Sequence, residues 1–271
     1  MRRKIAIQPE KEKKEKKIPI VVHRSAYRYT GVNLYMERLV SKRRNIYAVH
    51  SMATVPLFDV FQKGLIRGSE RLPHDPVKSY AYVEHPQEGW RVYLRSCVLL
   101  HKHFLEKSAQ KEFHPQHFLV VKRRGARYST ATWEPPKGQM EGKDAKKGNK
   151  SVMELLEENV RRETEEESHV TEIRRLRHTG LVFQSQETTY PPNTYFQYHI
   201  FQGFITPQQV KQSFDTFEWI KEHPKAFERW RRDRKEKDAV AWFDPRTTPL
   251  NPRWCPDIVA LYLQHVKGPV A

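Results

Sequence analysis

The sequence has few of the features that mark secreted, disulfide-linked or membrane-spanning proteins. It holds two cysteines, Cys97 and Cys255, in 271 residues, which is too few for a disulfide framework or a cysteine metal site. No apolar run approaches the length of about 18 residues that a membrane span needs. Residues 1–17 lack an apolar h-region, and their glutamates argue against a mitochondrial presequence. These absences predict a chain without membrane contact in a reducing compartment, cytoplasmic or nuclear.

Positive charge, by contrast, is abundant. The formal net charge is +17 at pH 7, and the sequence pI is about 9.8. This exceeds what an enzyme of small metabolites needs, and it favours a polyanionic partner such as nucleic acid, which binds through its phosphates. The alternative is a general solubility feature. Residues 1–17 have the composition of a charged, disordered tail.

The composition predicts one large domain with an extension. With 38% hydrophobic and 11% aromatic residues, the chain can bury a sizeable core. We assign residues 89–271 to the main domain and residues 18–88 to an N-terminal extension or small accessory region. In the latter, a strand is expected at 18–22, a helix at 33–43, and turns at 56–86.

The main domain shows both strand and helix patterns, which predicts a mixed α/β fold. A basic turn at 122–127 either steers phosphates or is a solvated hairpin tip. We expect strands at 91–103, 117–122, 172–177, 180–186, 195–205 and 239–243, and helices at 151–168, 208–237 and 255–266.

The predicted helix at 151–168 carries three converging acids. Glu163, Glu166 and Glu167 stand at i, i+3 and i+4, so their side chains share one face. A solvated helix face is the simpler interpretation, but here the acids continue an apolar stripe. Like charges at the edge of a core repel and resist desolvation, so a cation must lie among them. Oxygen-only clusters suit Mg²⁺ or Mn²⁺. The apolar residues of the stripe are Val152, Leu156 and Val160.

The run from Gly148 to Val170 resembles the Nudix box, G-x5-E-x7-R-E-U-x-E-E-x-G-U, in which U is aliphatic. Two positions depart from the pattern: Thr164 replaces an aliphatic residue, and His169 replaces the glycine after the helix. That glycine allows a left-handed helix end, which histidine tolerates less well, so we expect a local change in the turn. The positions in register are Gly148, Glu154, Arg162, Glu163, Glu166, Glu167 and Val170.

Residues 133–142, WEPPKGQMEG, resemble the segment that leads into the box in dinucleoside polyphosphate hydrolases and, more loosely, in mRNA-decapping enzymes. The glycine of this segment, Gly138, lies ten residues too early for the box, so residues 143–150 have the character of an insertion. Either Gly138 or Gly148 fills the role of the first box glycine. The Pro-Pro-Lys-Gly context favours Gly138.

The Nudix resemblance implies an α/β/α sandwich with a mixed sheet, here with an N-terminal extension, and hydrolysis of a diphosphate linkage with Mg²⁺ or Mn²⁺ as cofactor. It implies Glu163, Glu166 and Glu167 as catalytic metal ligands, with Glu154 as a supporting ligand. Arg162 is expected to hold a glutamate in orientation.

Other positions carry two interpretations each. Glu154 also suits a capping box at the start of the helix. Lys137 and Gly138 are expected beside the substrate phosphates. Glu187 is either a further metal ligand or base, or an exposed loop charge, and Tyr198 either stacks on a nucleobase or belongs to the core. The basic residues at 229–235 suit RNA or a solvated helix.

The resemblance leaves the substrate open. The high positive charge favours 5′-capped RNA and hence decapping. A dinucleoside polyphosphate of the Ap4A type or a diphosphoinositol polyphosphate is the alternative. A non-catalytic, RNA-binding Nudix-fold protein is the alternative of another class, and the retained box acids disfavour it. The sequence carries no signal for an oligomeric state.

Overall fold

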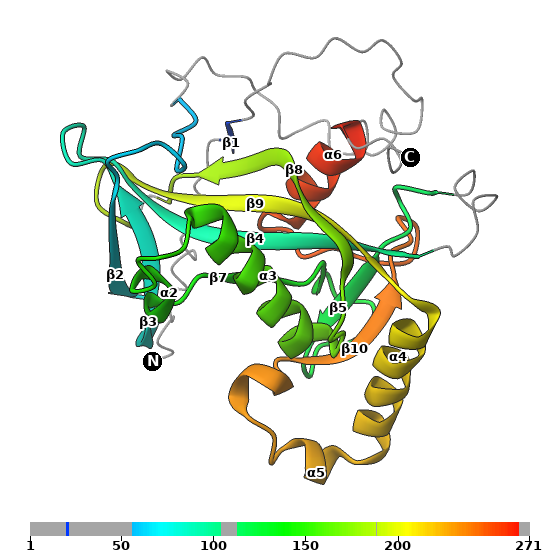
Figure 1. The fold of residues 1–271 in the computed structure, drawn as a ribbon. Coiled ribbons are helices and arrows are strands. Elements are labelled where there is room, and N and C mark those ends of the chain that lie inside the picture. Colours follow the sequence, from blue (N-terminus) through cyan, green and yellow to red (C-terminus); the bar gives the residue numbers. More distant parts are fainter. Residues whose placement is uncertain (1–19, 22–55, 104–112, 188, 266–271) are drawn as a thin grey trace, which may run out of the picture.

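The computed structural model describes residues 20–21, 56–103, 113–187 and 189–265. The predicted tail at 1–17 and the predicted helix at 33–43 lie outside the described residues. The described part has the expected mixed α/β fold, in which a mixed sheet lies between helices (Figure 1). In these four ranges, no helix is long and apolar enough to cross a membrane.

The main sheet has the strand order β1-β8-β9-β4-β3-β2, and β7 pairs with part of β4. The two long central strands, β4 and β9, are parallel, and the other pairs are antiparallel. The strands are β1 (Ile20–Val21), β2 (Ile66–Leu72), β3 (Asp75–Glu84), β4 (Arg91–Lys102), β7 (Lys137–Gln139), β8 (Arg174–Ser185) and β9 (Thr194–Ile205).

A second, smaller sheet has the order β10-β5-β6, with antiparallel pairs throughout. Because β6 is followed two residues later by β7 of the main sheet, this segment links the two sheets. Its strands are β5 (Leu119–Arg123), β6 (Trp133–Glu134) and β10 (Lys237–Trp242).

Helices cover both faces of the main sheet (Figure 1). The long helix α3 packs on one face and α6 on the other. Helix α4 continues from the end of β9 and packs beside β10. The helical segments are α2 (Gly142–Ala145), α3 (Val152–Ser168), α4 (Pro207–Glu222), α5 (Pro224–Phe227), the 3-10 turn η2 (Arg232–Lys235) and α6 (Cys255–His265).

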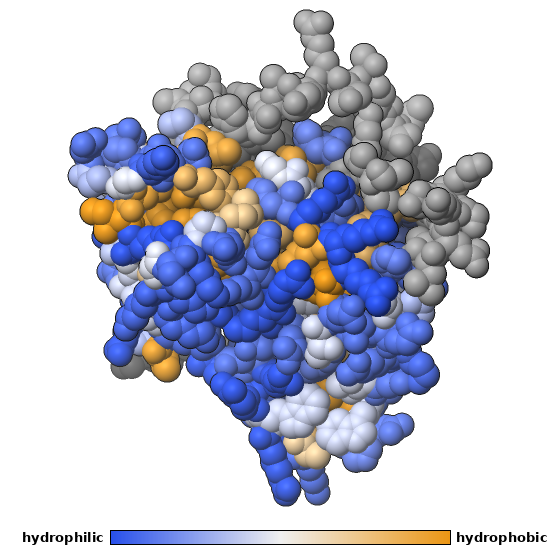
Figure 2. All heavy atoms as spheres, in the orientation of Figure 1, coloured by the Kyte–Doolittle hydropathy of each residue, from blue (hydrophilic) through white to orange (hydrophobic). Residues whose placement is uncertain are grey.

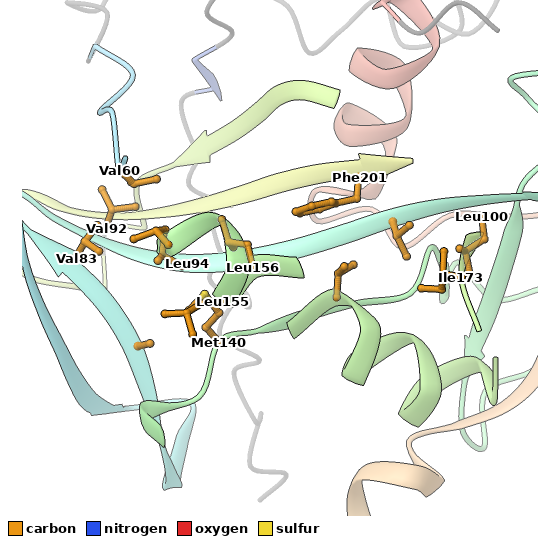
Figure 3. Close-up of a cluster of buried hydrophobic side chains, with 14 of the residues drawn as sticks. Val60, Val83, Val92, Leu94, Leu100, Met140, Leu155, Leu156, Ile173 and Phe201 are labelled. Carbon is orange, nitrogen blue, oxygen red and sulfur yellow. The ribbon is translucent and has the colours of Figure 1, made fainter. Parts of the chain in front are cut away.

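Strand β4 is buried on both faces because its side chains alternate between two cores. Val92 and Leu94 belong to the core under α3, together with Leu155 of that helix (Figure 3). Cys97 and Leu99 belong to the core that contains the apolar residues of α6. This period of two is what a central strand between two helical layers requires.

Helix α3 begins as predicted, with Ser151 as N-cap in a reciprocal capping box with Glu154. It ends at His169, whose φ of 58° and ψ of 20° are left-handed. The prediction of a changed turn is therefore wrong, because His169 adopts the left-handed conformation that a glycine would adopt at this position. Its buried ring packs against Phe217 and Trp230, at centroid distances of 5.0 and 5.4 Å, and these contacts offset the backbone strain.

The segment predicted to be turn-rich, 56–86, contains the antiparallel pair β2 and β3. Most residues of both strands are exposed or half-buried, so the hydrophobic alternation that identifies a strand is weak. Strand β3 pairs in turn with β4. This part of the N-terminal region thus extends the main sheet.

The single helix predicted at 208–237 is also wrong. Helix α4 ends at Glu222, and Pro224 begins α5. Proline lacks an N–H group and its ring clashes with the carbonyl four residues earlier, so it cannot continue the helix. The two strands expected at 172–177 and 180–186 form one strand, β8, with two register shifts and Gly180 at a φ of 80°.

Candidate functional site

The acids at the end of α3 lie against β7, as Gly138 shows. A Cβ atom added to Gly138 would overlap the carboxylate carbon of Glu163. Gly148, by contrast, is exposed, and an added Cβ there would meet no atom within 4 Å. Gly138 is therefore the glycine that lies next to the acids. This position requires glycine because the carboxylate of Glu163 occupies the space that a side chain would take.

Gly138→Ala is expected to push the Glu163 carboxylate out of its place and to lower the free energy of unfolding by about 1–3 kcal/mol, the usual effect of overpacking. Gly148→Ala is the matched control, with no steric consequence. Urea unfolding of the two variants and the parent measures the difference. Equal stabilities of the two alanine variants would contradict this placement of Glu163.

Glu163 is half-buried with too little positive charge around it. Burial, together with the charge of Glu167, raises the pKa of Glu163 to about 8, and Arg162 acts in the opposite direction. Nη2 of Arg162 lies 3.2 Å from Oε1 of Glu163 and donates at 2.6 Å to Oδ1 of Asn159. Arg162 thus contacts Glu163, but it does not fully compensate the charge.

In the protein without divalent ions, the contribution of Glu163 to stability is expected to be lost as the pH rises from about 4.5 to about 8. The unfolded chain ionises Glu163 near the ordinary pKa of 4.5, whereas the folded chain holds the proton up to about 8. The folded state therefore binds more protons in this window, and deprotonation favours unfolding. Thermal melts across this pH range should show the melting temperature of Glu163→Gln rising relative to that of the parent. Identical slopes would contradict the assignment.

Glu166 is half-buried and has no hydrogen bond or ion pair to any described residue. Burial raises its pKa; Arg162 opposes this effect, and the carboxylates of Asp233 and Glu141 add to it. Lys78 of β3 lies between these two neighbours, with Nζ at 2.7 Å from Asp233 Oδ1 and 3.6 Å from Glu141 Oε1. The N-terminal region thereby contributes a residue to the surroundings of Glu166.

Glu167 differs from the other two acids because lysines already hold it. Its Oε2 accepts a hydrogen bond of 2.9 Å from the backbone N–H of Lys137, and its Oε1 lies 3.0 Å from Nζ of Lys237. Lys237 also pairs with Glu134, and Nζ of Lys137 lies 3.2 Å from Glu134 Oε1. We call Glu134, Lys137, Glu167 and Lys237 the buried quartet. Two lysines balance two carboxylates in it.

The sequence did not reveal two members of the buried quartet. Glu134 lies in the WEPPKG segment that resembles the Nudix lead-in, beside the predicted Lys137 and Gly138. Lys237 lies at the start of β10, on the smaller sheet, and no spacing along the chain connects it with α3. Only the pairing of β10 and β6 with β5 places Lys237 and Glu134 together.

The structure does not bring Glu154 to the other acids. It lies nine residues before Glu163, about 13 Å along the helix axis. Its carboxylate accepts hydrogen bonds from the N–H group and the hydroxyl of Ser151, at 2.7 and 2.8 Å. This contact is the capping box that the sequence suggested. To support a metal held by Glu163 and Glu166, the Glu154 side chain would have to lie elsewhere.

Tyr198, Lys137 and Glu187 have their contacts with Trp254 and Arg95. Tyr198 is 5% exposed and stacks on Trp254 at a centroid distance of 4.4 Å. Of its two interpretations, a core residue or a ring that stacks on a nucleobase, this position agrees with the core residue. Nζ of Lys137 lies 4.6 Å from the centre of the Trp254 ring. Oε1 of Glu187 lies 3.8 Å from Nη1 of Arg95, whose guanidinium also faces the Tyr198 ring.

The donor set fits a divalent ion at two of the three predicted ligands. In the described part of the chain, no group of three or more His, Cys, Asp or Glu side chains is arranged to hold a metal. Mg²⁺, however, is commonly bound through one or two carboxylates together with substrate phosphates and water. Glu163 and Glu166 have the required oxygen atoms, and the pKa of each is raised in spite of Arg162, whereas Glu167 faces Lys237.

One cavity of the described part of the chain lies away from these acids. It has a volume of about 520 Å³ and is lined by Phe61, Lys63, Arg67 and Met153, among others, at the first turn of α3. The acids are at the last turns of the same helix.

The comparisons with known proteins show a distant likeness of fold. No family model matches the chain, and no curated protein matches it. A mutant of the Bacillus subtilis pyrophosphohydrolase BsRppH has 11% identity and a TM-score of 0.37 over 73% of this chain and 94% of its own. A mutT/nudix family protein from Listeria innocua has 18% identity and a TM-score of 0.34 over 64% of this chain and 92% of its own. Likeness at this level concerns the arrangement of helices and sheet alone.

Proposed function

We propose that this chain is a metal-dependent Nudix hydrolase that cleaves a diphosphate linkage in a nucleotide substrate. The observation that carries the proposal is the pair Glu163 and Glu166, which lies at the end of α3 beside Gly138 with too little positive charge. The box spacing from Arg162 to Glu167 supports the same chemistry.

The residues have separate roles in this proposal. Glu163 and Glu166 would hold Mg²⁺ or Mn²⁺, which when bound would neutralise substrate phosphates and activate water for attack. Arg162 keeps the Glu163 carboxylate in place through its short contact with Oε1. Glu167, held by Lys137 and Lys237, fixes β7 and Gly138 against the helix.

The substrate that we propose is 5′-capped RNA, so that the reaction is decapping. The net charge of +17 supports an extended polyanion. A dinucleoside polyphosphate or a diphosphoinositol polyphosphate is the alternative substrate, because both also present a diphosphate linkage.

A non-catalytic, RNA-binding role is the second candidate. The observation in its favour is Lys237, whose ammonium group takes a position at Glu167 where the box resemblance implies a metal. An acid neutralised by a lysine of the same chain needs no ion for charge balance. This candidate predicts RNA binding without turnover.

One set of reactions separates these candidates. The protein is incubated with Mg²⁺ or Mn²⁺ and, separately, cap-labelled RNA, free cap dinucleotide, Ap4A and a diphosphoinositol phosphate. Release of m7GDP from RNA but not from the free dinucleotide supports decapping. Preference for Ap4A or for the inositol compound assigns the alternative substrate, and no hydrolysis of any compound with retained RNA binding assigns the non-catalytic role.

A further inference from the structure

Three nearly parallel rings lie where α4 meets α5. Trp219 stacks on Trp230 at a centroid distance of 5.7 Å and an interplanar angle of 16°, and His223 stacks on Trp219 at 4.7 Å and 15°. Trp219 is 37% exposed, and His223 is exposed as well. Because Trp219 lies between the other two rings, a base of a single-stranded nucleic acid can extend this stack from its exposed end, at His223.

Cations surround these rings. Residues 221–235 contain seven basic and three acidic side chains. Lys225 and Arg229 are exposed and have no ion pair or hydrogen bond from their side chains to any described residue. Figure 2 shows side chains of intermediate hydropathy bordered by strongly hydrophilic ones at the lower tip of the molecule, where Figure 1 places α5. This combination complements a phosphate backbone with accessible bases.

The basic segment continues directly to the acids of α3. Arg234 of η2 pairs with Glu165, the neighbour of Glu166 in the chain. Asp233, the residue before it, adds to the raised pKa of Glu166 and binds Lys78. Trp230 also touches His169 at the end of α3. A strand whose 5′ end lies at Glu163 and Glu166 can therefore pass over η2 to the rings.

We propose that the surface formed by Trp219, His223, Lys225, Arg229 and Trp230 binds the single-stranded body of the RNA whose 5′ end is at the acids. We call it the ring surface. The inference rests on the proposed function for the identity of the substrate. It adds that bases stack on the rings while Lys225 and Arg229 contact phosphates, so affinity depends on RNA length and falls with salt.

The test is RNA binding by a protein that does not turn over its ligand. Fluorescence anisotropy is measured with a single-stranded 12-nucleotide RNA, labelled at its 3′ end, and full-length protein carrying Glu166→Gln. Adding Lys225→Glu and Arg229→Glu should raise Kd at least about 10-fold and flatten the dependence of log Kd on log salt. Adding Trp219→Ala should raise Kd about 10-fold, and Trp219→Phe should restore most of the affinity.

Arg246→Glu provides the matched control. Arg246 is exposed and follows the far end of β10 from η2, so its reversal changes net charge without touching the ring surface. Equal losses in Arg246→Glu and Arg229→Glu would overturn the inference, as would undetectable RNA binding by the parent. Release of m7GDP from cap-labelled RNA at saturating RNA concentration is measured in parallel with the unmutated acids. Absence of that release in the protein with an intact ring surface refutes the proposed function, whereas its presence beside unchanged RNA binding in the ring-surface variants refutes the ring surface alone.

Discussion

Glu166→Gln is expected to lower kcat for diphosphate hydrolysis at least about 10²-fold, the scale on which groups that stabilise developing charge act. Among the acids in register with the box, Glu166 is the one whose side chain has no hydrogen bond or ion pair in the described part of the chain, so its carboxylate is available to an ion. The substitution keeps the shape of the side chain and removes its charge. Steady-state rates with the substrate identified in the screen measure the effect.

Glu154→Gln is the matched control for this experiment. Glutamine also serves in a capping box, so the helix start is retained and kcat should change by no more than roughly twofold. Calorimetric titration with Mn²⁺ provides a readout that does not depend on turnover. Glu166→Gln should weaken Mn²⁺ binding, and Glu154→Gln should not. Full turnover in Glu166→Gln, or equal effects in the two variants, would remove the metal-site assignment.

The helices and strands that were predicted well are those in which the hydrophobic pattern of the sequence matches the burial of the side chains in the structure. Helix α3 has an apolar stripe and an N-cap in its own sequence, and β9 alternates with all twelve residues buried. Strands β2 and β3 lack that agreement because most of their side chains remain partly accessible. Their presence is decided by pairing with β4, which no local pattern records.

In the candidate site, too, some residues could be predicted from local sequence and others could not. Glu163, Glu166 and Glu167 were predictable because one helix sets their spacing. The partner of Glu167 was not, because Lys237 reaches it from a strand of the other sheet. The expectation that a cation must lie among the acids was sound in its physics, but for Glu167 that cation is a lysine. Sequence spacing identifies charges on one element, whereas their compensation depends on tertiary contacts.

Lys237→Met is expected to lower the free energy of unfolding by about 3–5 kcal/mol, because removing one partner leaves a buried charge uncompensated. Lys237 is 5% exposed, and its two partners, Glu134 and Glu167, are 5% and 4% exposed. Lys137 alone would then face two buried carboxylates. Urea unfolding measures the loss. Lys211→Met, which removes an exposed pair with Asp215, should change stability by no more than about 1 kcal/mol.

A second substitution shows whether charge or packing causes the loss. Glu134→Gln combined with Lys237→Met restores neutrality in the buried quartet, with Lys137 left to pair with Glu167. The double variant should therefore be more stable than Lys237→Met alone. The same logic applies to added ions: Mg²⁺ should raise the melting temperature of Lys237→Met more than that of the parent, because Glu167 has lost its lysine. Equal shifts, together with no recovery in the double variant, would mean that Lys237 stabilises the fold through its aliphatic chain and not through its charge.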